Sequence, residues 1–441
     1  MVTERVRLIG GRLIDPSQGL DAPADVVIGG GRVLEIVQNP ERARRQAIAG
    51  GERTIDVAGL VVAPGFVDLH CHLREPGFED KETIETGTRA AAAGGFTTIC
   101  AMPNTDPTSD TASDVEWVIS QAKKAGHVRV LPIGTITRGE KGLELSEMAD
   151  MANAGAVAFS DDGQPVKNAR LMRNALAYSR VTGRPIVDHA EDPDLVDGGV
   201  MHDGRVASLL GLRGVPAEAE EVQVARDVAL ARATGGRLHI AHVSTAAAVE
   251  LVRLAKSRGV GVTAEVTPHH LLMTDEWVSG NGSGRPPFNT NCRVNPPLRT
   301  DADRASLLDG ILDGTIDCIA TDHAPHTILD KDCEFDQAAP GISGLETALG
   351  LLMRLVDSKQ LDLPTLIRLL TVGAATAFKL DAGSLRVGSP ADIVVFDPTA
   401  EWTVDVRKFY SKGRNTPLHG ERLHGMVRMT FVGGEVVHEV G

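Results

Sequence analysis

The stretch VVAPGFVDLHCHLREPG, residues 61–77, follows an apolar run with two histidines placed one residue apart. The run from Val61 to Val67 predicts a buried strand. Side chains at positions i and i+2 of an extended segment leave the same face, so the imidazoles of His70 and His72 can point to one spot. Two neutral imidazoles at a strand end suit zinc or another borderline divalent metal. An ordinary strand-to-loop junction could carry the same pair, so the other strand ends decide between the two interpretations.

Residues 61–380 alternate apolar, strand-like runs with helical stretches, which is typical of parallel strands joined by crossover helices. The predicted strands lie near Phe66, Thr98, Val130, Val157, Ile186, Ile240, Val262 and Ile319. The predicted helices span 82–93, 115–125, 171–182, 218–234, 246–257 and 345–356. Eight strand–helix units predict an α/β fold of the (β/α)8 TIM-barrel type. A doubly wound open sheet is the alternative, but no G-x-G-x-x-G motif follows a strand to indicate dinucleotide binding.

The two ends of the chain have a different pattern. Residues 1–60 and 381–441 consist of short alternating segments separated by glycine-rich turns, which predict strands and hairpins. Two β-rich flanks around an α/β middle indicate that the N- and C-terminal segments meet in one small β-sandwich domain. We therefore expect residues 61–380 to form the barrel and the flanks to form the second domain together.

Polar side chains gather at the ends of the predicted barrel strands. They are His70, His72 and Arg74, then Asn104, Asp161-Asp162, Asp188-His189, His242 and Asp322-His323, with His326 shortly after. The carboxyl ends of barrel strands form one rim, where active sites are built. A single residue of this kind is usually a paired polar group or a helix N-cap, as Asp161 would be. Four histidines and two aspartates on one rim are hard to explain in that way, and they predict a metal site.

Other histidines are expected to have ordinary roles. His269 and His270, after the seventh strand, are candidates for structural residues or for supports of the ligands. Those predicted to lie on the solvated surface are His127, His202, His419, His424 and His438.

Composition excludes several classes of function. The 441 residues carry a formal net charge of −14 without a basic cluster, which argues against a nucleic-acid partner. The sequence predicts neither a secretory signal nor a run of membrane-spanning length. Its five cysteines are scattered, odd in number and lack C-x-x-C spacing, so we expect reduced thiols and a cytoplasmic location.

The strand-end residues resemble those of the amidohydrolase superfamily and, more narrowly, of the class I bacterial dihydroorotases. The resemblance covers essentially the whole chain, and the His-x-His pair and the strand-end histidines mark the superfamily. The narrower resemblance rests on Arg74, on Asn104, on Asp161-Asp162-Gly163 and on Asn295-Pro296-Pro297-Leu298-Arg299. It implies a zinc-dependent, reversible hydrolysis of dihydroorotate to N-carbamoyl-aspartate in pyrimidine synthesis.

The resemblance also implies roles for individual residues. His70, His72 and Asp322 would bind a first zinc, His189 and His242 a second, and Asp162 would bridge the two, so one or two ions per subunit are expected. Asp322 would also act as the catalytic base and then as the acid.

The substrate carboxylate would bind to a clamp of Arg74, Asn104 and His326, next to His72. Asn295 and the backbone at Pro340 and Gly341 would bind the edge of the pyrimidine ring.

Two rival interpretations remain open. Hydantoinases and allantoinases are related cyclic amidases, and many place a carboxylated lysine after the fourth strand. This sequence has aspartates there, and Lys167 lies five residues beyond Asp162. A non-catalytic scaffold subunit for aspartate transcarbamoylase would be expected to lose metal ligands, whereas here every ligand position is filled. A homodimer and an association with that transcarbamoylase are both open, and the charged segment 327–339 is a candidate loop over the mouth.

Overall fold

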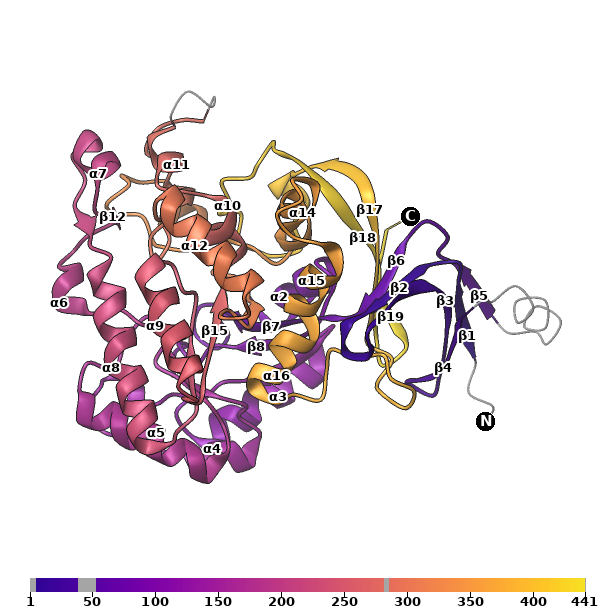
Figure 1. Cartoon of the computed structure of the whole chain (residues 1–441), viewed down its shortest axis with the longest axis horizontal. Helices are drawn as coiled ribbons and strands as arrows, with labels where there is room; N and C mark the ends of the chain where they lie inside the picture. Colours follow the sequence, from indigo (N-terminus) through magenta and orange to yellow (C-terminus); the bar gives the residue numbers. More distant parts are fainter. Residues whose placement is uncertain (1–4, 39–52, 281–284, 441) are drawn as a thin grey trace.

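The computed structural model of the chain describes residues 5–38, 53–280 and 285–440. Figure 1 shows an α/β body with a smaller β domain at one side, and both ends of the chain lie on the β-domain side. The N- and C-terminal strands are neighbours in this β domain, as the sequence predicts. No helix within the described ranges is long and apolar enough to cross a lipid bilayer.

Eight of the described strands form the predicted parallel barrel. They are β7 (Phe66–Cys71), β8 (Phe96–Ala101), β9 (Arg129–Pro132), β10 (Phe159–Ser160), β11 (Ile186–Asp188), β14 (Leu238–Ile240), β15 (Val262–Val266) and β16 (Cys318–Ile319). They pair as β7-β8-β9 and β10-β11-β14-β15-β16. Parallel bridges between Gly134 and Phe159 and between Cys71 and His323 join the two sheets, which closes the ring. The predicted fold class is confirmed.

Helices connect successive barrel strands. They are α2 (Ile84–Ala93), α3 (Ala112–Ala125), α4 (Met148–Ala154), α5 (Ala169–Thr182), α8 (Glu218–Thr234), α9 (Ala246–Ser257) and α12 (Asp301–Leu312), followed after β16 by α14 (Ala348–Asp357), α15 (Leu363–Arg368) and α16 (Ala374–Phe378). The predicted ranges 218–234 and 246–257 agree with α8 and α9. Elsewhere the observed starts differ by two or three residues. Capping boxes at Thr83 and Thr111 and an N-cap at Asn168 fix the first turns of α2, α3 and α5.

Nine of the described strands form the β domain. They are β1 (Val6–Ile9), β2 (Arg12–Asp15), β3 (Leu20–Gly29), β4 (Arg32–Gln38), β5 (Arg53–Asp56), β6 (Val61–Pro64), β17 (Ile393–Thr403), β18 (Arg422–Val432) and β19 (Glu435–Glu439). They lie in one sheet in the order β19-β18-β17-β6-β2-β3-β1-β5, with β4 paired to β3. Residues 1–4 and 39–52 of the predicted 1–60 segment lie outside the described residues.

The opening apolar run is two strands rather than one. β6 pairs with β17 and β2 in the β domain, and β7 begins the barrel. Gly65 separates them, and a Cβ at this position would lie 2.1 Å from the side chain of Thr97. We therefore propose that the domain boundary lies at Gly65 and not at residue 61.

The strands bury their apolar side chains in two hydrophobic clusters, one in the barrel and one in the β domain. Val67, Cys100, Val187, Cys318 and Phe378 belong to one buried cluster shared by the barrel strands and α16. The predicted core positions of Cys100 and Cys318 are thus confirmed, with neither side chain exposed to solvent. A separate cluster fills the β domain. The barrel interior is a packed core beneath the rim.

Insertions extend the barrel after β11 and β15. The first holds α6 (Pro193–Val196), β12 (Met201–His202), α7 (Arg205–Leu210) and β13 (Gly214–Val215), and the second holds α10 (Pro268–Leu272), α11 (Glu276–Ser279) and η3 (Thr290–Cys292). The surface prediction for His202 is wrong. Its imidazole is buried and its Nδ1 lies 3.3 Å from Arg299 Nη1, because β12 folds back onto β13 beside the Asn-Pro-Pro-Leu-Arg segment.

Candidate functional site

Side chains from several barrel strands converge at one point. His70, His72 and Asp162 bring their ligand atoms within 4.8 Å of one another, and so do Asp162, His189 and His242. All of these side chains are buried, and Asp162 belongs to both groups. The shared carboxylate lies 3.4 Å from His70 Nε2 and 3.4 Å from His189 Nδ1 through Oδ1. The strand ends therefore form one cluster with two halves.

Asp322 completes the first half of this cluster. Its Oδ1 lies 3.5 Å from His70 Nε2 and 3.3 Å from His72 Nε2. Asp322 has a φ of 46°, in the left-handed region that side chains other than glycine rarely adopt. The neighbouring residue Thr321 donates to the buried carboxylate of Asp68 from both its amide and its hydroxyl. This anchor holds the strained residue at the rim.

Hydrogen bonds on the far side of the rings orient the histidines. His70 Nδ1 lies 2.9 Å from Glu265 Oε1, and His72 Nδ1 lies 2.9 Å from Asn104 Oδ1. A carboxylate and an amide oxygen can only accept, so both rings carry their proton on Nδ1. Each Nε2 then presents a lone pair to the cluster, as a metal ligand must.

The charges in the cluster stabilise one another. Burial raises the pKa of Asp162, but the imidazoles of His70, His189 and His242 lower it well below its usual value. Burial lowers the pKa of His189, and Asp162 and Glu191 outweigh this and raise it to about 10. The carboxylates are therefore ionised and their surroundings favour positive charge.

The donor set fits a divalent metal. Among the described residues, His70 Nε2, Asp162 Oδ1 and His189 Nδ1 are buried without a hydrogen-bond partner. Two ligand atoms about 2.1 Å from one tetrahedral ion lie about 3.4 Å apart, and the measured separations between carboxylate and imidazole atoms are 3.3–3.7 Å. Imidazole nitrogens with carboxylate oxygens are ligands of the type that zinc accepts.

Arg74 lies beside this cluster. Its backbone has a φ of 61°, and its Nε donates to the carbonyl oxygen of Pro325 over 3.3 Å. Burial lowers the pKa of the guanidinium, and Asp322 and Asp162 act against that shift. A partly buried cation next to the metal ligands is suited to bind an anionic substrate group.

The other side chains of the predicted clamp are already engaged within the protein. Asn104 accepts from His72 and also lies 3.3 Å from the carbonyl oxygen of Asp162 through Nδ2, so one N–H of that amide remains for a ligand. His326 contacts the carbonyl oxygen of Pro340 through Nε2 at 2.8 Å, and burial lowers its pKa to about 3. A neutral ring that donates from Nε2 presents only a lone pair on Nδ1. His326 can therefore bind a carboxylate only in its other tautomer.

The groups predicted to bind the pyrimidine edge are engaged as well. Asn295 Nδ2 lies 2.9 Å from Glu191 Oε2 and 3.3 Å from His189 Nε2. The Gly341 amide donates to Arg293, and its carbonyl accepts from Asn415. The amide nitrogen of Asn295 thus supports a predicted metal ligand, which leaves its Oδ1 and the second lone pairs of the Pro340 and Gly341 carbonyls for a ligand.

Sequence reasoning missed Glu265, which is buried in the middle of β15. Burial raises its pKa, but hydrogen bonds from His239 and His70 lower it to about 2. A charged residue within the apolar run VTAEV was the available signal, because such residues are rarely buried unless they are paired. The ambiguous His270 is a structural residue, since it bonds Thr267 and the carbonyl oxygen of Pro296.

Lys331 joins the segment 327–339 to the insertion that follows β15. The segment contains α13 (Ile328–Lys331), and the buried ammonium of Lys331 donates to the carbonyl oxygens of Thr290, Arg293 and Ala339 at 2.6–3.3 Å. Three donors meet three acceptors, which uses the full capacity of the group.

Lys331→Met is expected to lower the free energy of unfolding by about 2–4 kcal/mol, because buried carbonyls lose their partner. Urea unfolding measures the change. Lys81→Met is the matched control, since the Lys81 ion pair with Asp330 at 3.5 Å is partly exposed and should contribute at most about 1 kcal/mol. Equal effects of the two variants would show that the Lys331 contacts do not hold the segment.

The chain is similar to known proteins over its whole length. The family described as dihydro-orotase-like matches residues 59–248. A dihydroorotase of Anaeromyxobacter sp. (strain K) is 52% identical over 98% of this chain and 97% of the relative, and a dihydroorotase of Geobacter metallireducens is 48% identical over 98% of each. The solved structure of an L-hydantoinase (dihydropyrimidinase) from Arthrobacter aurescens has a TM-score of 0.87 at 27% identity, covering 100% of this chain and 97% of the other.

The barrel, its β domain and the shared histidine–carboxylate cluster define a metal-dependent hydrolase of the amidohydrolase class. Within that class, sequence relatives at 46–52% identity are named dihydroorotases, whereas the hydantoinase named above is 27% identical. The chain belongs to the dihydroorotase family.

Proposed function

We propose that the chain catalyses the reversible hydrolysis of (S)-dihydroorotate to N-carbamoyl-L-aspartate with one or two zinc ions. The observation that carries the proposal is the position of Arg74, a partly buried guanidinium in the field of Asp162 and Asp322. Dihydroorotate carries a carboxylate, and an arginine beside the metal ligands is suited to bind it. The five cysteines are all free, which supports a reducing, cytoplasmic location.

In this proposal His70, His72 and Asp322 would hold one ion and His189 and His242 the other, with the carboxylate of Asp162 available to both. When bound, such an ion makes water a usable nucleophile near neutral pH and polarises the amide carbonyl. Asp322 takes the proton of the attacking water and returns it to the ring nitrogen that leaves. The imidazoles of His70 and His72 keep the pKa of Asp322 far below neutral, so the base is ready in its ionised form.

A substrate panel tests the proposal. The purified enzyme, with its zinc content measured, is assayed on dihydroorotate, hydantoin and allantoin. We expect kcat/KM for dihydroorotate to exceed the other values by at least about 100-fold, because a site that binds a carboxylate discriminates against substrates that lack it. Faster hydrolysis of hydantoin would favour a hydantoinase, and absence of turnover by zinc-loaded protein would favour a scaffold.

Arg74→Ala is expected to raise KM for dihydroorotate by about 10–100-fold, because a charge-assisted hydrogen bond contributes about 1.5–3 kcal/mol. The metal content should stay that of the wild type. Arg74→Lys is the matched variant. It keeps the charge and removes the planar fork, so it should recover part of the loss. Steady-state kinetics and metal analysis of both variants measure this, and an unchanged KM in Arg74→Ala would remove Arg74 from the clamp.

A further inference from the structure

A buried line of hydrogen bonds extends from the cluster into the barrel. Glu265 Oε1 lies 2.9 Å from His70 Nδ1, and Glu265 Oε2 lies 3.1 Å from His239 Nε2. His239 Nδ1 in turn lies 2.8 Å from the hydroxyl of Thr263. The line joins β7, β14 and β15, and Glu265 is 1% exposed. A carboxylate inside the barrel is thus bonded to the ring of one predicted ligand histidine and to one histidine outside the cluster, and it also accepts from the backbone amide of His242 at 3.4 Å.

His239, Glu265 and Cys318 also have ligand-type atoms close enough to hold an ion. Both nitrogens of His239 and both oxygens of Glu265 are already engaged in the hydrogen bonds above. In this arrangement His239 has no free ring nitrogen for an ion. A hydrogen-bonded support explains the arrangement better than a second metal site.

The protons along this line have one consistent order. Ionised Glu265 only accepts, so His70 donates from Nδ1 and His239 donates from Nε2. The Thr263 hydroxyl then donates to the bare Nδ1 of His239. With its proton fixed on Nδ1, His70 has its lone pair on Nε2, the atom 3.4 Å from Asp162 and 3.5 Å from Asp322. The line selects the ligand tautomer of His70.

The charge of Glu265 also favours metal binding. Two divalent ions bring four positive charges, and the ligand carboxylates Asp162 and Asp322 supply two negative ones. Glu265 supplies a third negative charge at hydrogen-bond distance from a ligand ring. In a buried site the interaction of such a charge with the ions is weakly screened.

We propose that Glu265, backed by His239, is a positioning residue that sets the affinity of the metal held by His70, His72 and Asp322. This proposal rests on the metal site of the proposed function. Loss of an outer partner of a ligand histidine typically lowers metal affinity by about 10–100-fold. In Glu265→Gln the amide nitrogen must face one of two imidazole N–H groups, so either His70 tilts or changes tautomer, or His239 moves its proton to Nδ1 and donates to the Thr263 hydroxyl. In both cases His70 loses the charged acceptor that fixes its tautomer.

The experiment is a zinc titration of metal-stripped full-length protein against a competing chelator. The titration gives one dissociation constant for each zinc ion that the protein binds. We expect Glu265→Gln to raise one of these constants about 10–100-fold above the wild-type value. His239→Phe should raise the same dissociation constant by a smaller factor, because Glu265 keeps its charge and loses only the hydrogen bond from His239. Thermal unfolding of each stripped protein reports stability separately.

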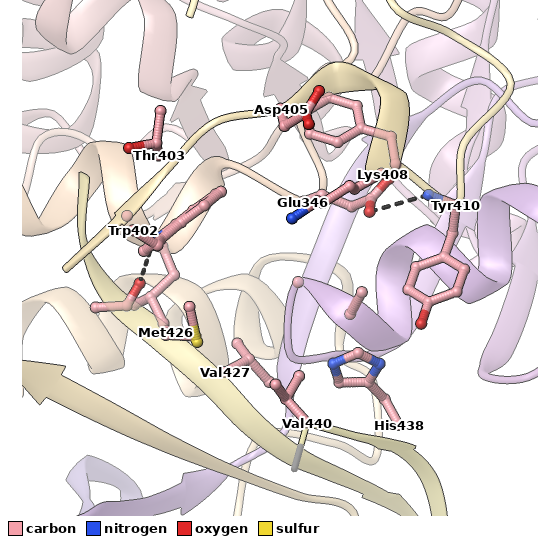
Figure 2. Close-up of a pocket in the computed structure, with 16 residues that line it drawn as sticks. Glu346, Trp402, Thr403, Asp405, Lys408, Tyr410, Met426, Val427, His438 and Val440 are labelled. Carbon is pink, nitrogen blue, oxygen red and sulfur yellow. Dashed lines mark hydrogen bonds between the residues drawn. The ribbon is translucent and has the colours of Figure 1, made fainter. Parts of the chain in front are cut away.

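Glu346→Gln is the matched control. A separate cavity of about 230 Å³ is lined by residues of α14, β17 and β18. Figure 2 shows Glu346 in this cavity, where it accepts a hydrogen bond from the Tyr410 amide. Burial raises the pKa of Glu346 to about 7. Glu346→Gln thus removes another poorly solvated carboxylate, and it should change stability without changing zinc affinity.

Wild-type zinc affinity in folded Glu265→Gln would overturn the proposal. If that variant does not fold, Glu265→Asp replaces it, since the shorter carboxylate keeps the charge but withdraws from His70. An intermediate zinc affinity would support the proposal, and wild-type affinity would overturn it. Failure of the proposed function is a different result, namely wild-type protein that binds zinc but does not hydrolyse dihydroorotate.

Discussion

Asp322→Asn is expected to fold normally and to lose about 10³-fold in kcat for dihydroorotate, within the range that a positioned acid–base group contributes. Asparagine has the shape of aspartate but cannot take a proton from water or return one to the ring nitrogen. The neighbouring anchor between Thr321 and Asp68 remains, so the rim should keep its geometry.

The assay is run at saturating zinc, because Asp322 also contacts His70 and His72 and its loss will weaken a metal ligand. Recovery of turnover on adding zinc would assign the defect to metal binding alone. Asp336 is an exposed aspartate in the segment 327–339, so Asp336→Asn is the matched control and should leave kcat unchanged. Wild-type turnover in Asp322→Asn would end the proton-transfer proposal.

The positions of the rim residues could be predicted because strand ends carry a simple pattern. Apolar runs followed by His, Asp or Asn identified six of the barrel strand ends, and the barrel geometry places those ends on one side. The division between β6 and β7 could not be predicted, because Val61–Val67 is apolar throughout and only Gly65 marks the break.

Side-chain partners were harder to predict than positions. The substrate roles predicted for Asn104 and Asn295 stay predictions, and the contacts that the sequence did not predict are those with His72 and His189. An amide can serve a ligand or a neighbouring ring, and the choice depends on distances that the primary order does not contain. Asp161 and Asp162 are also adjacent, and only the family resemblance, not the residue pattern, assigned the metal to Asp162.

The structure separates these two aspartates sharply. Asp162 points into the histidine–carboxylate cluster, and its Oδ2 lies 3.5 Å from His72 Nε2. Asp161 points the opposite way and accepts hydrogen bonds from the amides of Ile136 and Thr137 at 2.8 and 3.0 Å. Asp161 is therefore a support for the loop after β9 and not the helix cap that its position suggested.

Asp162→Asn is expected to lower zinc affinity by more than the roughly 100-fold that loss of an outer partner costs, because this carboxylate faces both halves of the cluster. Turnover at limiting zinc should fall with it. The adjacent Asp161→Asn should bind zinc like the wild type and lose about 1–3 kcal/mol in the free energy of unfolding, since buried amides lose an acceptor. Zinc titration should show the loss of affinity in Asp162→Asn, and urea unfolding should show the loss of stability in Asp161→Asn. Equal zinc affinities would show that Asp162 does not bridge the ions, because a one-residue shift along the strand end is the only difference between the variants.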